Sequence, residues 1–493
     1  MIQAQAGIER ALNLPSFPEL ARAAGIDADP PDVPVVCVQG LGFVGSAMAV
    51  AVADACDGDG APRFNVAGLD LPTPDGLAKI EAINAGRLPI AASDAELEAA
   101  LVAANARGNL VATSDERAYA LASVTLVDLP LDVTETNGRP GVRVDGFVDA
   151  VRTLGRTMPP GSLVIVETTV PPGTTEKLVA PALARELTAR GLAPDAIGVA
   201  YSYERVMPGT AYLESIVRSP RNYAGMTPAA AAACERFLSS VIDVGAHPLV
   251  RLASTTACET AKVLENSYRA TLIAFMEEWG RFAEALGIDL FEVISAIRTR
   301  PTHSNMRRPG FGVGGYCLTK DPLLAAVSAR ELHGRSDLEF PFSTLAVSVN
   351  RAMPMSTLRR LEVLMPGGLD GATVALMGVS YREGVADTRK SPSETFVREV
   401  RARGATVHVH DPLVRYWSEL ETIVPAELPP LAGVDAVVFA VPHGPYRQLD
   451  VEGWLGGAQP VVLDASDVLS AAQRATFARL GCTVASIGRG QVA

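Results

Sequence analysis

The chain has 493 residues, of which 48% are hydrophobic and 20% charged, and its formal net charge is -12. Because this length exceeds what a single hydrophobic core supports, two or three domains are expected. The negative charge argues against a nucleic-acid partner, and no apolar run is long enough to span a membrane.

Cysteine and histidine placement narrows the class further. Six cysteines are scattered without CxxC or zinc spacing, which favours a reducing cytoplasmic compartment over a disulfide framework. The first thirty residues lack the basic start and apolar core of a secretory signal. His408 and His410 share one face of an expected strand, but no third ligand accompanies them, so no metal site is predicted.

A nucleotide-binding motif follows an N-terminal extension, residues 1–32, that contains one amphipathic helical segment and has no assigned function. Gly40, Gly42 and Gly45 form GxGxxG between the β-branched run VPVVCV and a helix of small residues. The first glycine allows a tight turn, the second lets a pyrophosphate approach the backbone, and the third lets helix pack on strand. The amides at the helix N-terminus then face the phosphate.

Asp70 supports this interpretation because it ends the next apolar run, FNVAGLD. An acid at this place bonds the ribose hydroxyls of NAD and repels the extra phosphate of NADP. The interval from the glycines is longer than the usual distance of about 20 residues. The polar insert DACDGDGAPR accounts for the excess, and we expect it to be a surface loop.

Further apolar runs, LASVTLVDLP, SLVIVETTV and AIGVAYSYER, alternate with helical stretches. Such alternation predicts a parallel sheet with helices on both faces, and ligands bind at the carboxyl ends of its strands. The residues expected there are Thr168, Thr169, Pro171, Gly173 and Glu204. The alternative for the two threonines and Pro171 is that they are ordinary loop residues without a role in ligand binding.

A long helix is predicted over residues 255–286, because apolar residues recur there at steps of three and four. A stripe of this length suits a domain-bridging or subunit-packing helix. Lys262 and Asn266 share one face beside it, and by themselves they read as a solvated edge. The apolar positions are Ala261, Leu264, Tyr268, Leu272, Phe275, Trp279, Phe282 and Leu286.

The segment PGFGVGGYCLTKDP, residues 309–322, places a cysteine directly after a glycine-rich turn. Cys317 is followed by Lys320 and Asp321, and a nearby cation favours the nucleophilic thiolate. Glycines at this density let a ligand approach the main chain. The alternative is a surface turn followed by a buried, inert thiol.

A second α/β region begins at GATVALMGVS and continues through the strands ATVHVHD, DAVVFAVP and PVVLDAS. Its helix is opened by a capping box, Ser391-Pro392-Ser393-Glu394, with proline at the first helical position. The preceding segment YREGVADTRK carries Arg382, Asp387, Arg389 and Lys390. Cations beside a helix N-terminus can form a phosphate site, although a charge run is usually a solvated loop.

In this order the motifs resemble the UDP-glucose/GDP-mannose dehydrogenase family of nucleotide-sugar 6-dehydrogenases. The resemblance spans about residues 35–464 and rests on GLGFVG, INAGRLPI, ETTVPPGTTEK, ERVMPG, ETAKVLENSYRATLIAF, GVGGYCLTKDP and GVSYREGVADTRKSP. It implies an α/β fold with two Rossmann-like doubly wound domains joined by a long-helix central segment. The expected ranges are 33–253 for the NAD domain, 254–365 for the central dimerisation segment and 366–493 for the UDP-sugar domain.

The resemblance also implies a four-electron oxidation of a sugar C6 alcohol with two NAD molecules, by a cytoplasmic homodimer or larger homo-oligomer acting in polysaccharide biosynthesis. Cys317 would be the nucleophile that holds a thiohemiacetal and then a thioester. Lys262 and Asn266 would stabilise the oxyanion, Asp321 would act as the base, and Glu204 with Thr169 would act on the hydrolytic water. NAD would be held by Gly40, Gly42, Phe43, Val44, Gly45, Asp70 and Thr168. The nucleotide sugar would be held by Gly312, Gly314, Gly315, Arg307, Arg308, Arg382, Asp387 and Arg389.

Several positions depart from the family pattern. Tyr203 replaces the usual proline before Glu204, Arg382 replaces a lysine, Glu277 replaces an asparagine, and DLPLDVT stands where VPTP is common. ERVMPG resembles the UDP-N-acetylhexosamine branch, and we therefore expect UDP-N-acetylmannosamine or UDP-N-acetylglucosamine as substrate. Lys320 resembles the UDP-glucose branch, which is the alternative. A two-electron dehydrogenase of the 6-phosphogluconate type would not need Cys317, and a non-catalytic nucleotide-sugar sensor would not need a nucleophile.

Overall fold

The computed structural model describes residues 15–26, 30–90, 94–136 and 139–490. The chain forms two compact units. Unit 1 contains Met1–Val263 and Leu324–Glu339, and unit 2 contains Leu264–Leu323 and Phe340–Ala493. Each unit has its own sheet and its own buried cores.

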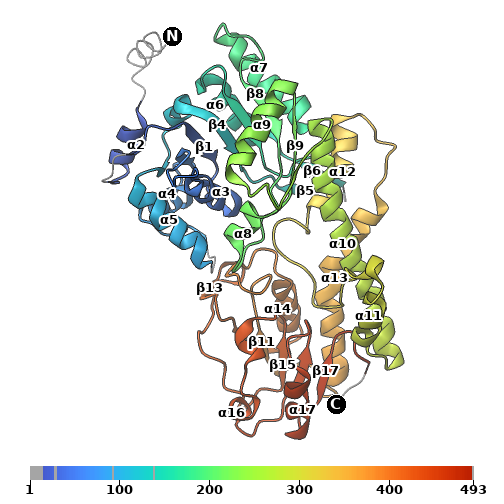
Figure 1. Ribbon diagram of the computed structural model, residues 1–493. Coiled ribbons are helices and arrows are strands. Elements are labelled where there is room, and N and C mark those ends of the chain that lie inside the picture. Colours follow the sequence, from blue (N-terminus) through green and yellow to red (C-terminus); the bar gives the residue numbers. More distant parts are fainter. Residues whose placement is uncertain (1–14, 27–29, 91–93, 137–138, 491–493) are drawn as a thin grey trace. The chain divides into compact units, whose positions relative to one another are not determined.

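Unit 1 is built on an eight-stranded sheet (Figure 1). In spatial order its strands are β10 (Leu249–Arg251), β9 (Arg221–Gly225), β8 (Gly198–Tyr201), β7 (Leu163–Val166), β4 (Ala122–Val127), β1 (Val35–Gln39), β2 (Asn65–Leu69) and β3 (Leu110–Thr113). The strand order reverses between β1 and β4, which is the topological switch point where doubly wound sheets bind ligands.

The predicted parallel sheet is confirmed for all pairs of this sheet except one. β8 and β9 pair antiparallel, with Ala200 opposite Gly225. The segment between them packs its short helix α8 (Tyr212–Val217) against α3 (Phe43–Asp54) instead of crossing back along the sheet, so β9 runs in the opposite direction. A separate antiparallel hairpin joins β5 (Val133–Thr136) and β6 (Arg139–Val142).

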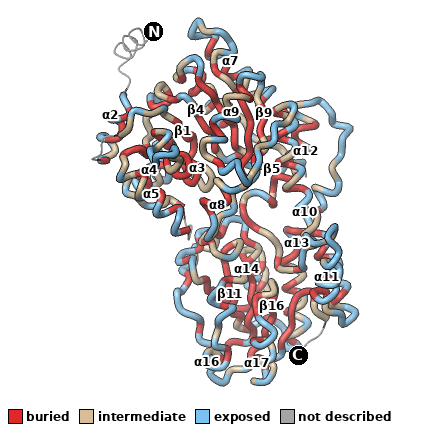
Figure 2. The backbone as a smooth tube through the Cα atoms, viewed as in Figure 1, coloured by how far each residue is buried: buried red, intermediate tan, exposed pale blue. Residues whose placement is uncertain are grey.

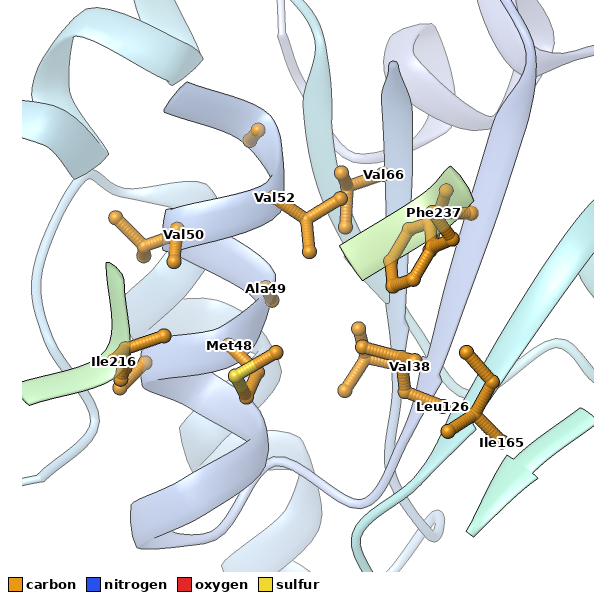
Figure 3. Packing of buried hydrophobic residues seen from close by; sticks show 14 of the residues in the cluster. Val38, Met48, Ala49, Val50, Val52, Val66, Leu126, Ile165, Ile216 and Phe237 are labelled. Atoms are coloured by element: carbon orange, nitrogen blue, oxygen red, sulfur yellow. The ribbon is translucent and has the colours of Figure 1, made fainter. Parts of the chain in front are cut away.

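Helices cover both faces of this sheet, and adjacent strand residues alternate between the two cores. Val36 and Val38 of β1 pack with α3 (Phe43–Asp54), α5 (Ala95–Arg107), α8 and α9 (Pro228–Val241). Cys37, between them, packs with α6 (Asp145–Thr157) and α7 (Ala180–Ala189) on the other face. Figure 3 shows Met48 and Ala49 of α3 facing strand residues such as Val38. Figure 2 shows the strands buried and the outer helix faces exposed.

The described part of the N-terminal extension contains the helix α2 (Phe17–Ala23), opened by a capping box from Ser16 to Glu19. Residues 1–14 and 27–29 of the range in which a helix was expected lie outside the described residues. Phe17 and Leu20 join the second core of unit 1, so this helix is an integral part of the unit. The polar insert after α3 is an exposed loop, as predicted. The described residues of unit 1 also form the α-helices α4 (Pro74–Asn84) and α12 (Leu324–Val327).

Unit 2 contains a five-stranded parallel sheet in the order β12 (Thr406–His410), β11 (Thr373–Met377), β15 (Ala436–Phe439), β16 (Val461–Asp464) and β17 (Val484–Ser486). α13 (Pro341–Leu364) and α14 (Pro392–Ala402) pack on one face. α15 (Gly444–Arg447), α16 (Val451–Leu455) and α17 (Ala471–Arg479) pack on the other. A short hairpin pairs β13 (Tyr416–Trp417) with β14 (Thr422–Ile423).

Only part of the predicted capping box at α14 is formed. Ser391 Oγ accepts a hydrogen bond from the amide of Ser393. Glu394 instead pairs with Arg398, one turn along the helix, at 2.9 Å. The serine cap and Pro392 at the first helical position still fix where the helix begins.

Each unit has an acid after the second strand of its nucleotide-binding half that holds the loop after the first strand. In unit 1 Asp70 Oδ2 accepts from the amide of Leu41 at 3.0 Å. In unit 2 Asp411 Oδ2 accepts from the amides of Val379 and Ser380. The second unit therefore repeats the architecture of the first although its loop lacks the glycine fingerprint.

The long predicted helix is α10 (Thr255–Leu286), which starts in unit 1 and continues in unit 2, where α11 (Leu290–Arg298) follows. Six apolar residues of the predicted stripe are 45% to 65% exposed, and we call them the α10 stripe. The α10 stripe consists of Leu264, Tyr268, Phe275, Trp279, Phe282 and Leu286. Lys262 and Asn266 are both buried, so they are not the solvated edge that their spacing alone suggests.

Candidate active site

The glycine loop of unit 1 has the geometry that a pyrophosphate requires. Gly40 has a φ of +98°, a left-handed conformation that favours glycine. A side chain at Gly45 would begin 1.8 Å from the carbonyl oxygen of Gly40, whereas Gly42 faces open space. Phe43 starts α3, so the amides of its first turn adjoin this open space.

Asp70 lies at the end of β2, beside the glycine loop. Its carboxylate accepts hydrogen bonds from the amides of Leu41 and Leu71, at 3.0 and 2.8 Å. Lys79 Nζ lies 3.6 Å from Asp70 and 2.5 Å from Asp75. These contacts fix the carboxylate at the place where an adenosine ribose meets a Rossmann sheet.

The residues predicted at the carboxyl ends of β7 and β8 differ in their contacts. Thr168 Oγ1 donates to the carbonyl oxygens of Val127 and Leu129, at 3.1 and 2.9 Å, and thus holds the loop after β4. Thr169 follows it and is half-buried. Glu204, after β8, is buried and accepts a hydrogen bond from the amide of Val206.

Glu204 and Lys262 lie together in unit 1. Lys262 Nζ donates to the carbonyl oxygen of Glu204 at 2.9 Å and lies 3.5 Å from its carboxylate. The ammonium group also lies 5.2 Å from the centre of the Tyr203 ring. Tyr203, the residue that replaces the family's proline, therefore supports the cation by a cation–π contact.

The cysteine-bearing loop of unit 2 is held tightly against the segment between β11 and α14. Gly315 has a φ of +76°, and its amide donates to the carbonyl oxygen of Arg389 at 3.0 Å. A side chain at Gly315 would begin 2.8 Å from the Tyr381 ring, and one at Gly314 would begin 2.5 Å from the carbonyl oxygen of Lys390. Glycine is required here because the two backbones nearly touch.

Two further glycine-loop contacts come from α13. Val313 exchanges two hydrogen bonds with the side chain of Asn350, at 2.8 and 2.6 Å. Gly312, with a φ of +111°, lies against Asn350 and Met353. The loop is therefore fixed on both sides, and it presents Cys317 as an exposed side chain.

Asp321 is the best-anchored acid near the cysteine in sequence. It is 1% exposed, and its Oδ2 accepts from Asn266 Nδ2 at 2.8 Å. Its Oδ1 accepts from Lys320 Nζ at 2.9 Å. The backbone carbonyl oxygen of Cys317 accepts hydrogen bonds from the amides of Lys320 and Asp321. These bonds form a helical turn, so the carboxylate of Asp321 follows the thiol by one turn.

The Tyr381–Lys390 segment holds its charged residues in defined positions. Asp387 is buried and binds Arg389 through both carboxylate oxygens, with a shortest distance of 2.8 Å. Arg389 itself is exposed. Arg382 is half-buried, and its carbonyl oxygen accepts from Ser380 Oγ. The structure thus brings the segment YREGVADTRK, residues 381–390, against the glycine loop.

Arg307 and Arg308 are both exposed, ahead of the glycine loop. Arg308 pairs with Asp467 at 3.1 Å and lies 5.5 Å from the Phe291 ring centre. Arg308 therefore contacts a residue of the loop between β16 and α17 and a residue of α11. Arg307 acts on Arg269, whose pKa its positive charge lowers.

Two residues of this region were missed by the sequence analysis. Tyr316 adjoins Cys317, and Lys320, Arg389 and Lys390 all place their cationic groups within 4.5 to 5.7 Å of its ring centre. Such a cluster concentrates positive charge around an aromatic face. No spacing rule predicts it, because the cations come from two separate segments.

Arg269 is the second missed residue. It lies three positions after Asn266 on α10, so the two share a face. Partial burial and Arg307 lower the pKa of Arg269, whereas Glu265 and Cys317 oppose the shift. The helical spacing from Asn266 was the signal that could have identified it.

Comparisons with known proteins identify the family of this chain. Three models of the UDP-glucose/GDP-mannose dehydrogenase family match the chain: the NAD binding domain at residues 35–238, the central domain at 256–352 and the UDP binding domain at 375–471. A UDP-N-acetyl-D-mannosamine dehydrogenase from Pyrococcus horikoshii is 32% identical over 349 residues, which cover 70% of this chain and 76% of that protein.

The chain belongs to the UDP-glucose/GDP-mannose dehydrogenase family. It is an NAD-dependent oxidoreductase of nucleotide sugars. Solved structures agree: a UDP-D-ManNAc dehydrogenase from Pyrococcus horikoshii has a TM-score of 0.76 at 26% identity, covering 92% of this chain and 99% of that chain. A UDP-glucose dehydrogenase from Pyrobaculum islandicum has a TM-score of 0.74 at 28% identity, covering 90% and 96%.

The residues of this nucleotide-sugar dehydrogenase fit NAD. A side chain at Gly45 would fill the turn on which α3 packs, and Gly42 leaves the approach to the first amides of α3 open. Asp70 is fixed by two amides and is placed for ribose hydroxyls. Among the described residues no helix has both the length and the apolar character needed to cross a membrane. In the same ranges no three His, Cys, Asp or Glu side chains gather as a metal-binding group.

Replacing Asp70 by Asn is expected to weaken NAD binding about tenfold. It should also reduce the selectivity of the site for NAD over NADP. The amide keeps the shape and one acceptor for Leu41, but it loses the charge that repels a 2′-phosphate. Titrations of the dehydrogenase with NAD and NADP, followed by protein fluorescence, measure both constants. Asp75→Asn is the control, because Asp75 contacts the same Lys79 but is exposed. An unchanged ratio of the two constants in D70N would contradict this role.

Glu259 anchors α10 to the loop after β7. Its carboxylate accepts from the amides of Gly173 and Thr175, at 2.5 and 2.8 Å. Burial raises the pKa of Glu259 to about 7, against the opposing effect of these hydrogen bonds. Gly173, one of the residues predicted on the sheet rim, thus binds a helix of the same unit.

The raised pKa of Glu259 predicts a pH dependence of stability. The folded state holds a proton on Glu259 up to about pH 7, whereas the unfolded chain loses it near its ordinary value of 4.5. The stability that Glu259 contributes is therefore fully present below pH 4.5, and it is lost as the pH rises through about 7, the pKa of Glu259 in the folded state. Glu259→Gln should remove up to about 3 kcal/mol of this decline between pH 5 and 8. Urea unfolding at several pH values tests it, and exposed Glu81→Gln should behave like the wild type.

Proposed function

We propose that this dehydrogenase oxidises the C6 alcohol of a UDP-N-acetylhexosamine, UDP-N-acetylmannosamine or UDP-N-acetylglucosamine, to the carboxylate in a four-electron reaction. The observation that carries the proposal is the arrangement of Cys317 in unit 2. The exposed thiol lies on a rigid glycine loop, one turn before an acid held by Asn266 and Lys320. A two-electron dehydrogenase has no use for an exposed nucleophile placed in this way.

The residues of the chain have separate tasks in this reaction. Asp321 accepts, through a water, the proton that the C6 alcohol loses in the first oxidation. The Cys317 thiolate then adds to the aldehyde carbon, and the resulting oxyanion takes a proton to give a thiohemiacetal. Loss of a second hydride and of the hydroxyl proton leaves a thioester on Cys317.

Glu204 activates the water that cleaves the thioester, with Thr169 as its polar neighbour. The water adds to the carbonyl carbon, the C–S bond breaks, and the carboxylate leaves with the thiolate restored. Lys262 and Asn266, one turn apart on α10, supply donors for the oxyanions of these steps. NAD supplies the hydride acceptor, so that one alcohol, two NAD+ and one water become one carboxylate, two NADH and three protons.

The N-acetylated substrate class is supported by the ERVMPG segment and by relatives. Arg205 of this segment donates to the carbonyl oxygen of Pro220 and lies 5.4 Å from the Tyr203 ring centre. UDP-N-acetyl-D-mannosamine dehydrogenases are among the curated relatives. UDP-glucose is the second candidate, because Lys320 resembles that branch and binds Asp321 directly.

A substrate panel tests the proposal. NADH formation is measured with UDP-N-acetylmannosamine, UDP-N-acetylglucosamine, UDP-glucose and GDP-mannose at limiting sugar. We expect two NADH per molecule of an N-acetylated sugar and at least tenfold lower kcat/KM with UDP-glucose. One NADH per sugar would remove the thioester step, and a preference for UDP-glucose would replace the substrate class. Tight sugar binding with no NADH from any sugar would indicate a non-catalytic relative.

The α10 stripe supports a homodimer as the assembly. Its aromatic residues contact one another, with ring centres 6.2 Å apart for Phe275 and Trp279 and 5.7 Å apart for Trp279 and Phe282. A contiguous exposed aromatic surface of this kind marks a protein–protein contact. We therefore propose that a second copy of the chain covers it.

The double variant Trp279→Glu/Phe282→Glu is expected to convert the dimer into monomers. Two carboxylates at the centre of an apolar contact cannot be paired, so their desolvation opposes association. Size-exclusion chromatography with light scattering measures the mass directly. Ile423→Glu, at an exposed apolar residue of β14, should leave the mass unchanged. A double variant that kept twice the chain mass would place the interface elsewhere.

A further inference from the structure

An unusual group of buried charges lies in unit 1 at the ends of its strands. Asp128 follows β4, Glu167 follows β7, and Arg221 begins β9. Arg221 Nη1 donates to Glu167 Oε1 at 2.7 Å, and both side chains are at most 1% exposed. Asp128 is also buried, and neither of its carboxyl oxygens has a hydrogen-bond partner in the described structure. One buried acid is therefore left without a compensating contact.

The topology places this group on the nicotinamide side of the cofactor site. Asp70 at the end of β2 marks the adenosine side, and the glycine loop between β1 and β4 marks the pyrophosphate. The second nucleotide of NAD must then lie toward the ends of β4, β7 and β8. Asp128 adjoins the glycine loop, because its Cβ lies 3.2 Å from where a side chain at Gly45 would begin.

The position of Asp128 is also held firmly. Its amide donates to the carbonyl oxygen of Gln39 at 2.9 Å. Thr168 donates to the carbonyl oxygens on either side of it, those of Val127 and Leu129. Asp128 begins the DLPLDVT stretch that departs from the family's VPTP pattern. Asp128 is therefore an acid held at a fixed point beside the glycine loop.

The charges facing Asp128 decide its protonation before a cofactor binds. Burial raises the pKa of Asp128 well above its ordinary value, and the carboxylates of Glu167 and Glu204 raise it further, whereas Arg221 opposes them. Arg221 is already paired with Glu167, and Lys262 with Glu204. Asp128 consequently holds a proton until another positive charge approaches.

We propose that Asp128 exchanges a proton with solvent in step with the charge of the nicotinamide ring, and so makes the site selective for oxidised over reduced NAD. The proposal rests on NAD dependence and is independent of which sugar is oxidised. The oxidised ring carries a positive charge, which favours the Asp128 carboxylate across a medium of low dielectric constant. Asp128 therefore releases its proton to solvent when NAD+ binds.

Asp128 takes a proton back when the positive charge disappears. A hydride delivers two electrons and one proton to the ring, which becomes neutral and no longer stabilises the carboxylate. Asp128 then regains one proton from solvent, and the charge of the site is restored. The reduced cofactor loses the attraction that held the oxidised one. In an enzyme that exchanges cofactor between two oxidations, this difference favours departure of NADH.

Calorimetric titration of the wild-type dehydrogenase tests the proposal without any sugar. Binding of NAD+, NADH and ADP-ribose is measured at pH 7.5 in buffers of different ionisation enthalpy, which gives the number of protons released. NAD+ should release a substantial fraction of one proton more than NADH or ADP-ribose, because ADP-ribose lacks the ring. Equal proton release by all three ligands would overturn the proposal, and this comparison needs no variant.

Asp128→Asn assigns the proton to this residue. In D128N the excess release with NAD+ should vanish, and the ratio of the Kd of NADH to that of NAD+ should fall about tenfold, the change that corresponds to one pKa unit. The affinity for ADP-ribose should stay the same. D70N is the matched control, because it should weaken all three ligands alike. A D128N protein that still released the excess proton, or kept the wild-type ratio, would exclude Asp128.

Discussion

Cys317→Ser is expected to lower the rate of sugar oxidation at least 1,000-fold while leaving NAD binding unchanged, because a hydroxyl does not replace the thiolate as nucleophile at neutral pH. The residue is well suited to the role among the cysteines of the chain. Burial raises the pKa of the thiols of Cys37, Cys234 and Cys258, so these remain protonated and inert. Cys317 is exposed and adjoins the cations around Tyr316.

The measurement combines steady-state NADH formation with a fluorescence titration of NAD. Cys56→Ser is the control, because Cys56 is half-buried in unit 1 and lies outside the glycine loop. Iodoacetamide should label Cys317 before the buried thiols, and UDP-sugar should protect it. A C317S enzyme with wild-type turnover would end the nucleophile assignment and the thioester mechanism with it.

The parts of the fold that the sequence predicted are those with local signals. The apolar runs correspond to β1, β2, β4, β7, β8 and β11, and the apolar spacing predicted α10 with its observed ends. These signals depend on residues that are neighbours in the chain. The antiparallel β8–β9 pair could not be predicted in this way, because it depends on where α8 packs.

The candidate site shows the same division. GxGxxG and the residue after β2 can be identified from spacing, and the structure places Gly40, Gly45 and Asp70 together. The burial of Lys262 and Asn266 was not predictable, since their partners Glu204 and Asp321 are 58 and 55 residues away in sequence. Tyr316 and Asp128 were missed for the same reason. Their importance comes from charges that converge from separate segments.

Glu204→Gln is expected to separate oxidation from hydrolysis. The amide keeps the acceptor for the amide of Val206 and a contact for Lys262, but it cannot take a proton from the hydrolytic water. Both hydride transfers should proceed, so that NADH forms in a burst of two per active site. The later steady rate should be at least 100-fold below that of the wild type. Glu214→Gln, at an exposed acid of α8 in the same unit, is the control.

Intact-protein mass spectrometry during the steady state measures the trapped species. We expect the mass of E204Q to increase by that of the UDP-uronyl group, and hydroxylamine should remove this adduct because it cleaves thioesters. The adduct must be absent from a C317S/E204Q double variant, since the sulfur that carries it is gone. A burst of one NADH would mean that Glu204 already takes part in the second oxidation. Wild-type hydrolysis in E204Q would assign activation of the water to another group, for which Asp321 is the nearest acid along the chain to Cys317.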